Sequence, residues 1–240
     1  MVGAIAWSFL CPDAETAFQV PSLARIFFWH FPCPMMQLGF MFVGAFCALM
    51  FFRTPTSEAR QRMIWDSRAE AAVDLSGIFT ILTMLSGMVF SKAEWGDFWS
   101  WDPRQYSYIA VILIMLAYFV VRAAFPDPEA RASHSAAYIL TAVLPVLFLV
   151  YVFPHIPSIE KQSLHPSDTI ISGQLKGVYA YVTIFVLTLV TWLCVWLYRM
   201  RVRVNLMEFE LGQLEIPRHA AGPVPVVRPV SVSHADGEKD

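Results

Sequence analysis

Long apolar runs separated by short polar connectors dominate the chain. The runs cover residues 26–52, 71–90, 107–121, 135–153 and 178–198. A helix needs about 20 mainly apolar residues to cross the ~30 Å hydrocarbon core of a bilayer, so each run predicts a membrane-spanning helix. Residues 1–10 are also apolar, but a helix rises only about 1.5 Å per residue, so they reach about half of that distance. We therefore expect residues 1–25 to be a short N-terminal apolar segment and connector, left by a truncated first span or a misplaced start site.

Polar stretches complete this organisation. Residues 53–70 form an expected polar loop and residues 91–106 an aromatic one, while the connector between the last two runs holds His155 and His165. Asp74 stands near the start of the second run, where its side chain is expected to reach the bilayer surface. Residues 204–240 are rich in Pro, acidic and small residues without apolar periodicity, which predicts a disordered tail. Residues 26–203 are thus expected to form one transmembrane bundle.

Composition narrows the class of protein. Hydrophobic residues make up 57 % of the chain and charged residues 15 %, with a mean hydropathy of +0.52. These values indicate an all-α integral membrane protein, a polytopic helix bundle, rather than a soluble domain. A net charge of −2 without a basic stripe argues against nucleic-acid binding. The four cysteines show no CxxC pair, so neither a metal site nor a disulfide framework is indicated.

Lysines and arginines are distributed unequally between the two faces of the expected bundle. One face collects twelve of the 17, from the loop after the first span, the connector after the third and the tail. The other face carries Arg25, Lys92, Arg104, Lys161 and Lys176. Because cytoplasmic loops carry the excess of positive charge, we expect the C-terminus to be cytoplasmic. His30, His155, His165 and the aromatic loop then face the outside, which in a bacterium with two membranes is the periplasm.

The stretch from Trp95 to Tyr108 concentrates aromatic residues at this outer face. It reads Trp-Gly-Asp-Phe-Trp-Ser-Trp-Asp-Pro-Arg-Gln-Tyr-Ser-Tyr, with three tryptophans within seven residues. Enrichment of Trp at bilayer interfaces offers a purely structural explanation. The topology, however, also delivers two imidazoles, those of His30 and His165, to the same face. Flat aromatic rings beside paired imidazoles suit haem, because imidazole binds haem iron and indoles stack on flat rings.

Charged residues of the same face add to this hypothesis. The two haem propionates are expected to pair with cations of the outer face, namely Arg25, Arg104, Lys161 and Lys176. Asp102 can accept a hydrogen bond from an imidazole or cap the helix that begins near Pro103, and capping is the favoured interpretation. His155, beside Pro154, is expected to have a structural role.

The same residues resemble those of a known family. The tryptophan-rich WWD signature of haem-handling proteins in cytochrome c maturation is matched by Trp95, Gly96, Trp99, Trp101, Asp102, Arg104 and Ser107. The segment from Arg25 to Pro32 resembles the histidine-bearing opening of a span in haem exporter protein C. Leu164 and His165 are similar to the segment that holds the second histidine of that family. The resemblance extends from about Arg25 to Arg203.

The resemblance implies a site, a cargo and a set of partners. His30 and His165 would be the axial ligands of haem iron, with the aromatic loop against the porphyrin and haem b carried as cargo. The protein would lie in the bacterial inner membrane and pass haem to a membrane-tethered periplasmic haem chaperone. A small single-span subunit and an ABC transporter of the same pathway are the other implied partners. Binding and transfer are expected rather than bond-forming catalysis, because the sequence shows no combination of nucleophile, base and acid, no phosphate loop and no zinc spacing.

Four other functions remain open. A cytochrome c synthetase, or haem lyase, is suggested by Pro103 after Asp102, which looks more like the larger synthetases of the other maturation system. A bis-histidine cytochrome b would place its histidines inside the helices. A haem-transporting channel subunit would need a polar path across the bundle, and a membrane scaffold with an aromatic belt would bind no haem.

Overall fold

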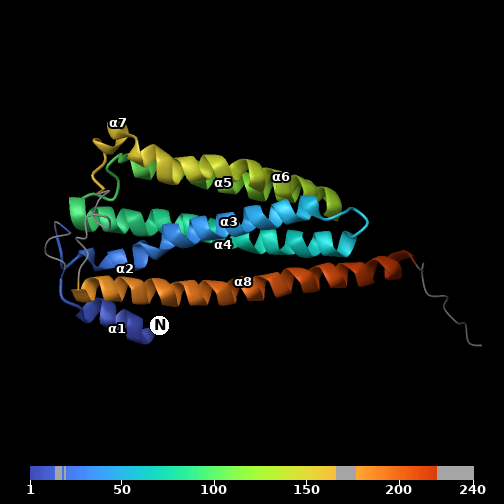
Figure 1. Ribbon diagram of the computed structural model, residues 1–240, viewed down its shortest axis with the longest axis horizontal. Coiled ribbons are helices and arrows are strands. Elements are labelled where there is room, and N and C mark those ends of the chain that lie inside the picture. The colour runs from blue at the N-terminus through green and yellow to red at the C-terminus, as the bar shows by residue number, and fades with distance from the viewer. Residues whose placement is uncertain (14–17, 19, 166–176, 221–240) are drawn as a thin grey trace, which may run out of the picture.

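The computed structural model describes residues 1–13, 18, 20–165 and 177–220, with side chains as far as Gln213. All regular elements of the described residues are helical (Figure 1). In chain order they are α1 (Val2–Leu10), η1 (Ala24–Ile26), α2 (Phe27–His30), α3 (Pro32–Arg53), α4 (Ala59–Trp95), α5 (Pro103–Ala124), α6 (Pro128–Leu147), the π-helix η2 (Phe148–Val152), η3 (Phe153–His155), α7 (Pro157–Glu160) and α8 (Gly177–Ala220).

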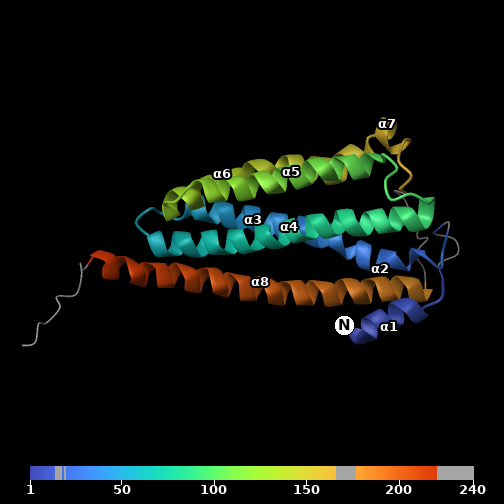
Figure 2. The same cartoon turned by 180° about the vertical axis from the view of Figure 1, so that it is seen from behind.

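Five helical stretches of the described chain are long and apolar enough to cross a bilayer. They are Phe27–Arg53, Ala59–Trp95, Pro103–Ala124, Pro128–His155 and Gly177–Gln213. Each coincides with one of the apolar runs to within one residue or contains it, so the prediction of a polytopic all-α membrane protein with five spans is confirmed. The apolar N-terminal segment forms the short helix α1, which lies beside the first part of α8 in both views (Figures 1 and 2).

The helices pack in layers. Figure 1 shows α5 and α6 on one side, α3 and α4 in the middle, and α8 on the other side. The largest buried cluster joins α3, α4, α5 and α6 and includes Met41, Phe51, Val111, Tyr118 and Ile139. Because successive spans run in opposite directions, the connections fall at two ends of the bundle.

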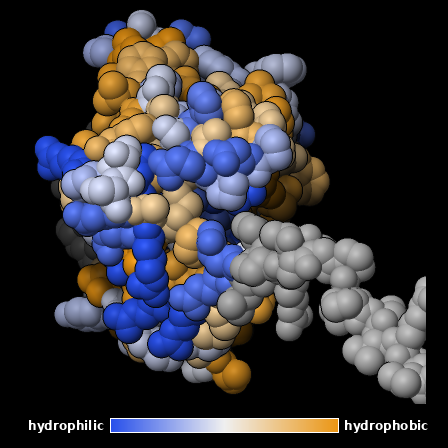
Figure 3. Space-filling model, turned by 90° about the vertical axis from the view of Figure 1, so that its right-hand side faces the viewer, coloured by the Kyte–Doolittle hydropathy of each residue, from blue (hydrophilic) through white to orange (hydrophobic). Residues whose placement is uncertain are grey.

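The two ends differ in chemistry. One end, on the left in Figure 1, is called the pocket end below. It holds α2, the connection between α4 and α5, and the segment around α7. The opposite, arginine-rich end holds the connection between α3 and α4, that between α5 and α6, and the far part of α8. Viewed onto this second end, hydrophilic residues gather in the centre of the face, with hydrophobic residues toward the flanks (Figure 3).

Large apolar side chains are exposed along the flanks of the bundle. Leu113, Leu144 and Trp192 are 60 %, 69 % and 70 % exposed, and they come from three different spans. Soluble monomers rarely expose extensive apolar surface without a binding partner for it. With five spans of sufficient length, these side chains identify a surface that faces lipid in a multi-pass membrane protein.

The prediction of a polar loop over residues 53–70 is wrong for most of that range. Only residues 54–58 connect the two helices, because α4 already begins at Ala59. The charged residues of this first part of α4 are paired with neighbouring helices. Arg62, which is buried, donates to Glu129 at the start of α6 and to the carbonyl oxygen of Phe51 on α3. Such pairs allow a polar segment to continue a helix that composition alone assigned to a loop.

The prediction of a disordered tail from residue 204 is also wrong at its start, because α8 continues to Ala220. Asn205 is 5 % exposed and donates from its amide nitrogen to the carbonyl oxygen of Ser67. Phe209 packs against the main buried cluster. Extending an existing helix is far easier than nucleating one, so these contacts suffice to continue α8. Residues 221–240 lie outside the described residues.

Carboxylates of α4 are paired with arginines of two other spans. Asp66, Glu70 and Asp74 follow each other at intervals of four residues, which places them on one face of the helix. Arg122 of α5 donates to both oxygens of Asp66, at 3.0 and 2.9 Å, and to Glu70 at 2.8 Å. Arg201 of α8 donates to Asp74 at 2.7 Å. Asp74, expected near the beginning of its helix, therefore sits well inside α4 with an arginine partner.

Replacing Arg122 with Ala should destabilise the protein strongly. The side chains of Arg122 and Asp66 are only 12 % and 10 % exposed, so the substitution leaves the buried Asp66 and the partly buried Glu70 without their cation, at a cost of about 3–5 kcal/mol. Denaturant unfolding in detergent micelles measures this loss. The matched control is Arg60→Ala, whose pair with Glu210 is 76 % and 59 % exposed and contributes at most about 1 kcal/mol. Equal losses for the two variants would contradict a role for the buried network.

Candidate functional site

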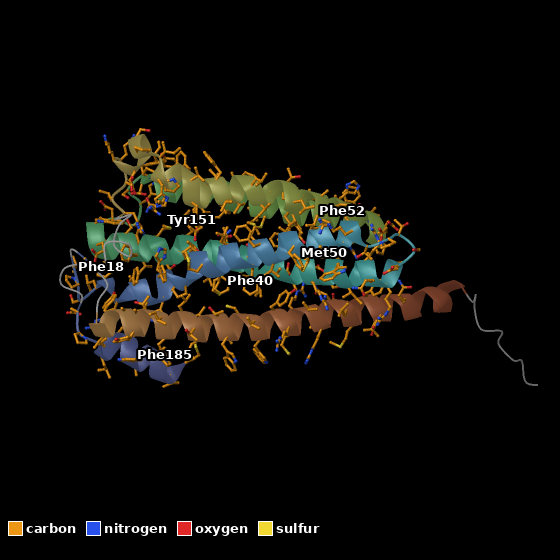
Figure 4. All side chains as sticks on the ribbon, in the orientation of Figure 1. Phe18, Phe40, Met50, Phe52, Tyr151 and Phe185 are labelled. Atoms are coloured by element: carbon orange, nitrogen blue, oxygen red, sulfur yellow. The ribbon has the colours of Figure 1, made fainter. Side chains whose placement is uncertain are left out.

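A cavity of about 260 Å³ opens at the pocket end of the bundle. Its wall is formed by α2, α3, α4, α5, η2, η3 and the segment that follows α7. Figure 4 labels two of the lining residues, Phe18 and Tyr151, at this end of the molecule. Three imidazoles line the cavity, those of His30, His155 and His165, and most of the remaining wall is aromatic or aliphatic.

His30 is the last residue of α2 and lies against α4. The two helical segments α2 and α3 are separated at Phe31, because Pro32 has no N–H group to continue the ladder of hydrogen bonds and instead occupies the first turn of α3. The Nδ1 atom of His30 lies 2.9 Å from the hydroxyl oxygen of Ser86. The imidazole is stacked on the ring of Phe90, with 5.9 Å between centroids and 14° between planes.

His165 arrives from a segment 135 positions further along the chain. Its ring centroid lies 6.2 Å from that of Phe90 and 6.3 Å from that of Trp95. The buried ring of Phe90 thus contacts both imidazoles that the sequence singled out. The structure brings these two histidines to one cavity, while their role as iron ligands stays a prediction.

Asp102 fixes the position of the His165 segment. Its Oδ1 atom accepts from the backbone N–H of Arg104 at 2.8 Å, which is the N-cap bond that the sequence predicted. Its Oδ2 atom accepts from the hydroxyl of Ser163 at 2.9 Å and from the N–H of Leu164 at 2.7 Å. The Ser163 hydroxyl oxygen in turn accepts from the N–H of His165 at 3.2 Å. One carboxylate therefore caps α5 and holds the segment that carries His165.

The aromatic loop is shorter than expected. Residues 91–95 belong to α4, and α5 begins at Pro103, so only Gly96 to Asp102 connect the two helices. Gly96 has φ +87° and ends α4 in the left-handed conformation that glycine adopts without steric cost. Trp95, the last residue of α4, lines the cavity. The expected loop over 91–106 is therefore corrected to seven residues.

The other two tryptophans lie in this connection and are not among the described residues that line the cavity. Trp99 and Trp101 pack edge to face at 5.5 Å. Trp101 is 74 % exposed and has φ +55°, a conformation that costs a residue with a side chain on the order of 1–3 kcal/mol. The side chain of Gln105 braces the loop, accepting from the N–H of Ser100 and donating to the carbonyl oxygen of Phe98. An exposed Trp is thus held outside the cavity.

The cations expected to pair with propionates are placed differently from one another. Arg104 lines the cavity. Arg25 does not, because its guanidinium donates to the carbonyl oxygens of Ser8 and Phe9 at the end of α1 and pairs with Asp13 at 2.7 Å. Its position is explained by the unpaired carbonyl groups at a helix C-terminus. Lys161 is exposed near α7, and Lys176 lies outside the described residues.

His155 is the lining residue that the sequence assigned to a structural role. Its Nδ1 atom lies 2.6 Å from the carbonyl oxygen of Tyr151, and because a carbonyl only accepts, Nδ1 carries the proton. Both residues follow Pro145, which lies inside α6, and the helix adopts π geometry from Phe148 to Val152. In the sequence, Pro145 was the signal that could have drawn attention to this segment. A proline inside a helix disturbs its regular hydrogen bonds, and π-helical turns are frequent at functional sites. It did not indicate which side chains would reach the cavity.

The donor set of the cavity fits a metal that already has ligands of its own. Among the described residues, no three His, Cys, Asp or Glu side chains are grouped so as to hold a bare metal ion. Haem iron has four ligands from the porphyrin and needs only axial ones, for which imidazole is suited. Aromatic walls suit the porphyrin face, and the guanidinium of Arg104 suits a propionate. The residues present therefore fit haem.

Comparisons with known proteins agree with this chemistry. A family model described as "Heme exporter protein C" matches residues 1–217. Relatives with the same name occur in Paracoccus denitrificans (24 % identical over 150 residues, covering 62 % of this chain and 56 % of the relative) and in Bradyrhizobium diazoefficiens (30 % over 147 residues, 58 % and 51 %). A "Putative cytochrome c biosynthesis ccmC-like mitochondrial protein" of Marchantia polymorpha is 27 % identical over 103 residues, covering 43 % and 42 %. The chain spans about half the length of the curated relatives it matches.

Substituting Asp102 with Ala should release the His165 segment as well as weaken the start of α5. The lost cap alone costs about 0.5–2 kcal/mol, and Ser163 and Leu164 lose their shared acceptor. Hydrogen exchange followed by mass spectrometry should show faster exchange across residues 163–165. Asp127→Ala is the matched control, because Asp127 also precedes a proline and caps α6 through the N–H of Ala130. If both variants leave exchange at residues 163–165 unchanged, Asp102 does not hold this segment.

Proposed function

The chain belongs to the haem exporter protein C family, and on this premise we propose that it binds haem in the membrane and delivers it for the biogenesis of c-type cytochromes. The observation that carries the proposal is the convergence of two imidazoles, from segments far apart in the chain, on one cavity with aromatic walls. Haem b is the cargo in this proposal, and no bond-forming catalysis by the chain is required.

His30 and His165 are the proposed axial ligands of haem iron. Their placement on one cavity supports this assignment, as does the ring of Phe90 that contacts both. To bind on opposite sides of the iron, the two imidazoles must separate to admit the porphyrin, so the ring of Phe90 is expected to move aside on binding. Trp95 and Phe90 then offer aromatic contacts to the macrocycle, each worth roughly 0.5–1.5 kcal/mol beyond burial.

The size of the cavity favours partial enclosure of the cargo. At about 260 Å³ it lies just below the range of roughly 300–1,000 Å³ typical of small-molecule sites. One edge of the porphyrin is therefore expected to remain outside, where a recipient can reach it. Trp99 and Trp101 lie in the connection beside the cavity, and Trp101 is exposed. We assign them to contacts with this outer edge, and Arg104 to a propionate at the wall.

The charge distribution supports an orientation. The arginine-rich end collects the excess of basic residues and is proposed to be cytoplasmic. The cavity then faces the periplasm of a bacterial inner membrane. A membrane-tethered periplasmic haem chaperone is the proposed recipient, with an ABC transporter and a small single-span subunit of the same pathway as further partners. The resemblance to the family supports these partners, and Arg25 is left out of the proposed haem contacts because it is engaged with α1.

The visible absorption spectrum of the protein purified in detergent from haem-replete cells tests the ligand assignment. The parent is expected to show a bis-imidazole spectrum, which His30→Ala and His165→Ala each lose and added imidazole restores. His134→Ala is the matched control, because His134 stacks on Phe125 at the arginine-rich end, 4.0 Å between centroids, and should leave the spectrum unchanged.

Two results would contradict this proposal. A parent spectrum that neither substitution changes would mean that other residues bind the iron. A parent that remains free of haem, even when a haem chaperone is present in the same cells, would favour the membrane scaffold.

A further inference from the structure

Two consecutive residues of α4, Ser86 and Gly87, lie directly against the imidazole of His30. The hydroxyl oxygen of Ser86 is 2.9 Å from Nδ1 of His30. A Cβ atom built on Gly87 would lie 3.1 Å from Cε1 of the same ring. Gly87 lines the cavity, and neither residue belongs to the tryptophan-rich signature or to the two histidine segments from which the site was predicted.

The hydrogen bonds of Ser86 determine which nitrogen of His30 carries the proton. A serine hydroxyl has one proton to donate and lone pairs to accept with. The Ser86 oxygen lies 2.6 Å from the carbonyl oxygen of Leu82, four residues earlier in α4, and 3.4 Å from that of Thr83. A carbonyl oxygen can only accept, so the short contact with Leu82 uses the hydroxyl proton. Toward His30 the Ser86 oxygen is then an acceptor, and Nδ1 is the nitrogen that carries hydrogen.

From this arrangement we infer that Ser86 is a positioning residue, which holds His30 as the Nδ1–H tautomer and thereby leaves the Nε2 lone pair for haem iron. The inference rests on the proposed function for its purpose, since the tautomer matters only if His30 binds a metal. Metal-binding histidines generally donate their second N–H to an oxygen, which fixes the ring orientation and raises the basicity of the ligand. Here the oxygen comes from a serine whose own proton is bound within the helix.

Gly87 fixes the plane of the ring. The Cβ of an alanine at this position would approach Cε1 to 3.1 Å, Nδ1 to 3.8 Å and Nε2 to 3.9 Å. The first distance is shorter than van der Waals contact, so the imidazole would have to move by a few tenths of an ångström. In the haem-free protein the ring is also stacked on Phe90. Ser86 therefore sets the tautomer of His30, and Gly87 limits the orientation of its ring.

The tautomer is tested in the haem-free protein by nitrogen NMR with labelled histidine, above the ordinary titration range of imidazole near a pKa of about 6.5. His30, assigned by comparison with His30→Ala, should show a protonated Nδ1 in the parent. In Ser86→Ala this preference should be lost, and Ser86→Thr should restore it. His155 serves as an internal control, because its Nδ1–H bond to the carbonyl oxygen of Tyr151 is independent of Ser86.

Haem binding provides a second readout. Ser86→Ala should weaken haem affinity about 10–100-fold, the usual effect of removing a hydrogen-bond partner of a metal-binding histidine, with recovery in Ser86→Thr. Gly87→Ala should keep the tautomer but change the electron paramagnetic resonance of the ferric complex, which depends on the relative orientation of the two imidazole planes. Thr141→Ala is the matched control, since Thr141 makes the same bond to a carbonyl four residues earlier, on α6 and away from the cavity.

The results separate this inference from the proposed function. An Nε2–H tautomer of His30 in the parent, or an unchanged tautomer in Ser86→Ala, would overturn the role of Ser86 whether or not the protein binds haem. A lost tautomer preference with haem affinity unchanged would overturn its role in iron binding. A parent without haem would overturn the proposed function and with it the purpose of the tautomer, while the NMR result would still describe His30 itself.

Discussion

The main constraint on this structure is that polar groups within a bilayer must find their partners inside the protein. Helix α4 meets this constraint along its whole length, with Asp66 and Glu70 paired to Arg122, Asp74 paired to Arg201, and Ser86 bonded to His30. Together these contacts join α4 to three other helices. The partners cannot be exchanged without leaving a charge or a donor in an apolar environment, so the polar contacts fix how α5, α8 and α2 lie against α4.

The same constraint organises the cavity. The carboxylate of Asp102 stands at the start of α5, where the first N–H groups of a helix need acceptors. It satisfies one of them and then accepts two more hydrogen bonds from the segment of His165. The position of one proposed ligand is therefore tied to the cap of a helix, and that of the other to a hydroxyl in the middle of a helix. The hydrogen bonds that place these two segments come from Asp102 and Ser86, and the tryptophans, the most conspicuous feature of the sequence, contribute ring packing of Trp95 on His165.

Much of the fold could be predicted from the sequence, because apolar runs of sufficient length have few alternatives in lipid. The five spans and the cap at Asp102 follow from local patterns. The errors arose where a distant partner overrides local composition. The composition of residues 59–70 indicates a polar loop, but the contact of Arg62 with Glu129 holds this segment in a helix. The composition of residues 204–213 indicates a tail, but the contact of Asn205 with Ser67 does the same there. For the same reason the sequence could place His30 and His165 on one face but could not identify Phe90 and His155 as cavity residues, or Ser86 as the partner of His30.

The two proposed ligands are held with unequal rigidity, and this difference bears on how a cargo is both kept and released. His30 ends a helical segment, is bonded to Ser86 and stacks on Phe90, so moving it would disturb the contact of α2 with α4. His165 belongs to a non-helical segment in which Ser163 and Leu164 donate to the carboxylate of Asp102, and its ring packs near Phe90 and Trp95. Exchange of an iron ligand requires one imidazole to leave while the other retains the metal. Under the proposed ligation, a ligand carried by a loop is expected to leave before one held where two helices pack together, so His165 would leave first and His30 would retain the iron until transfer.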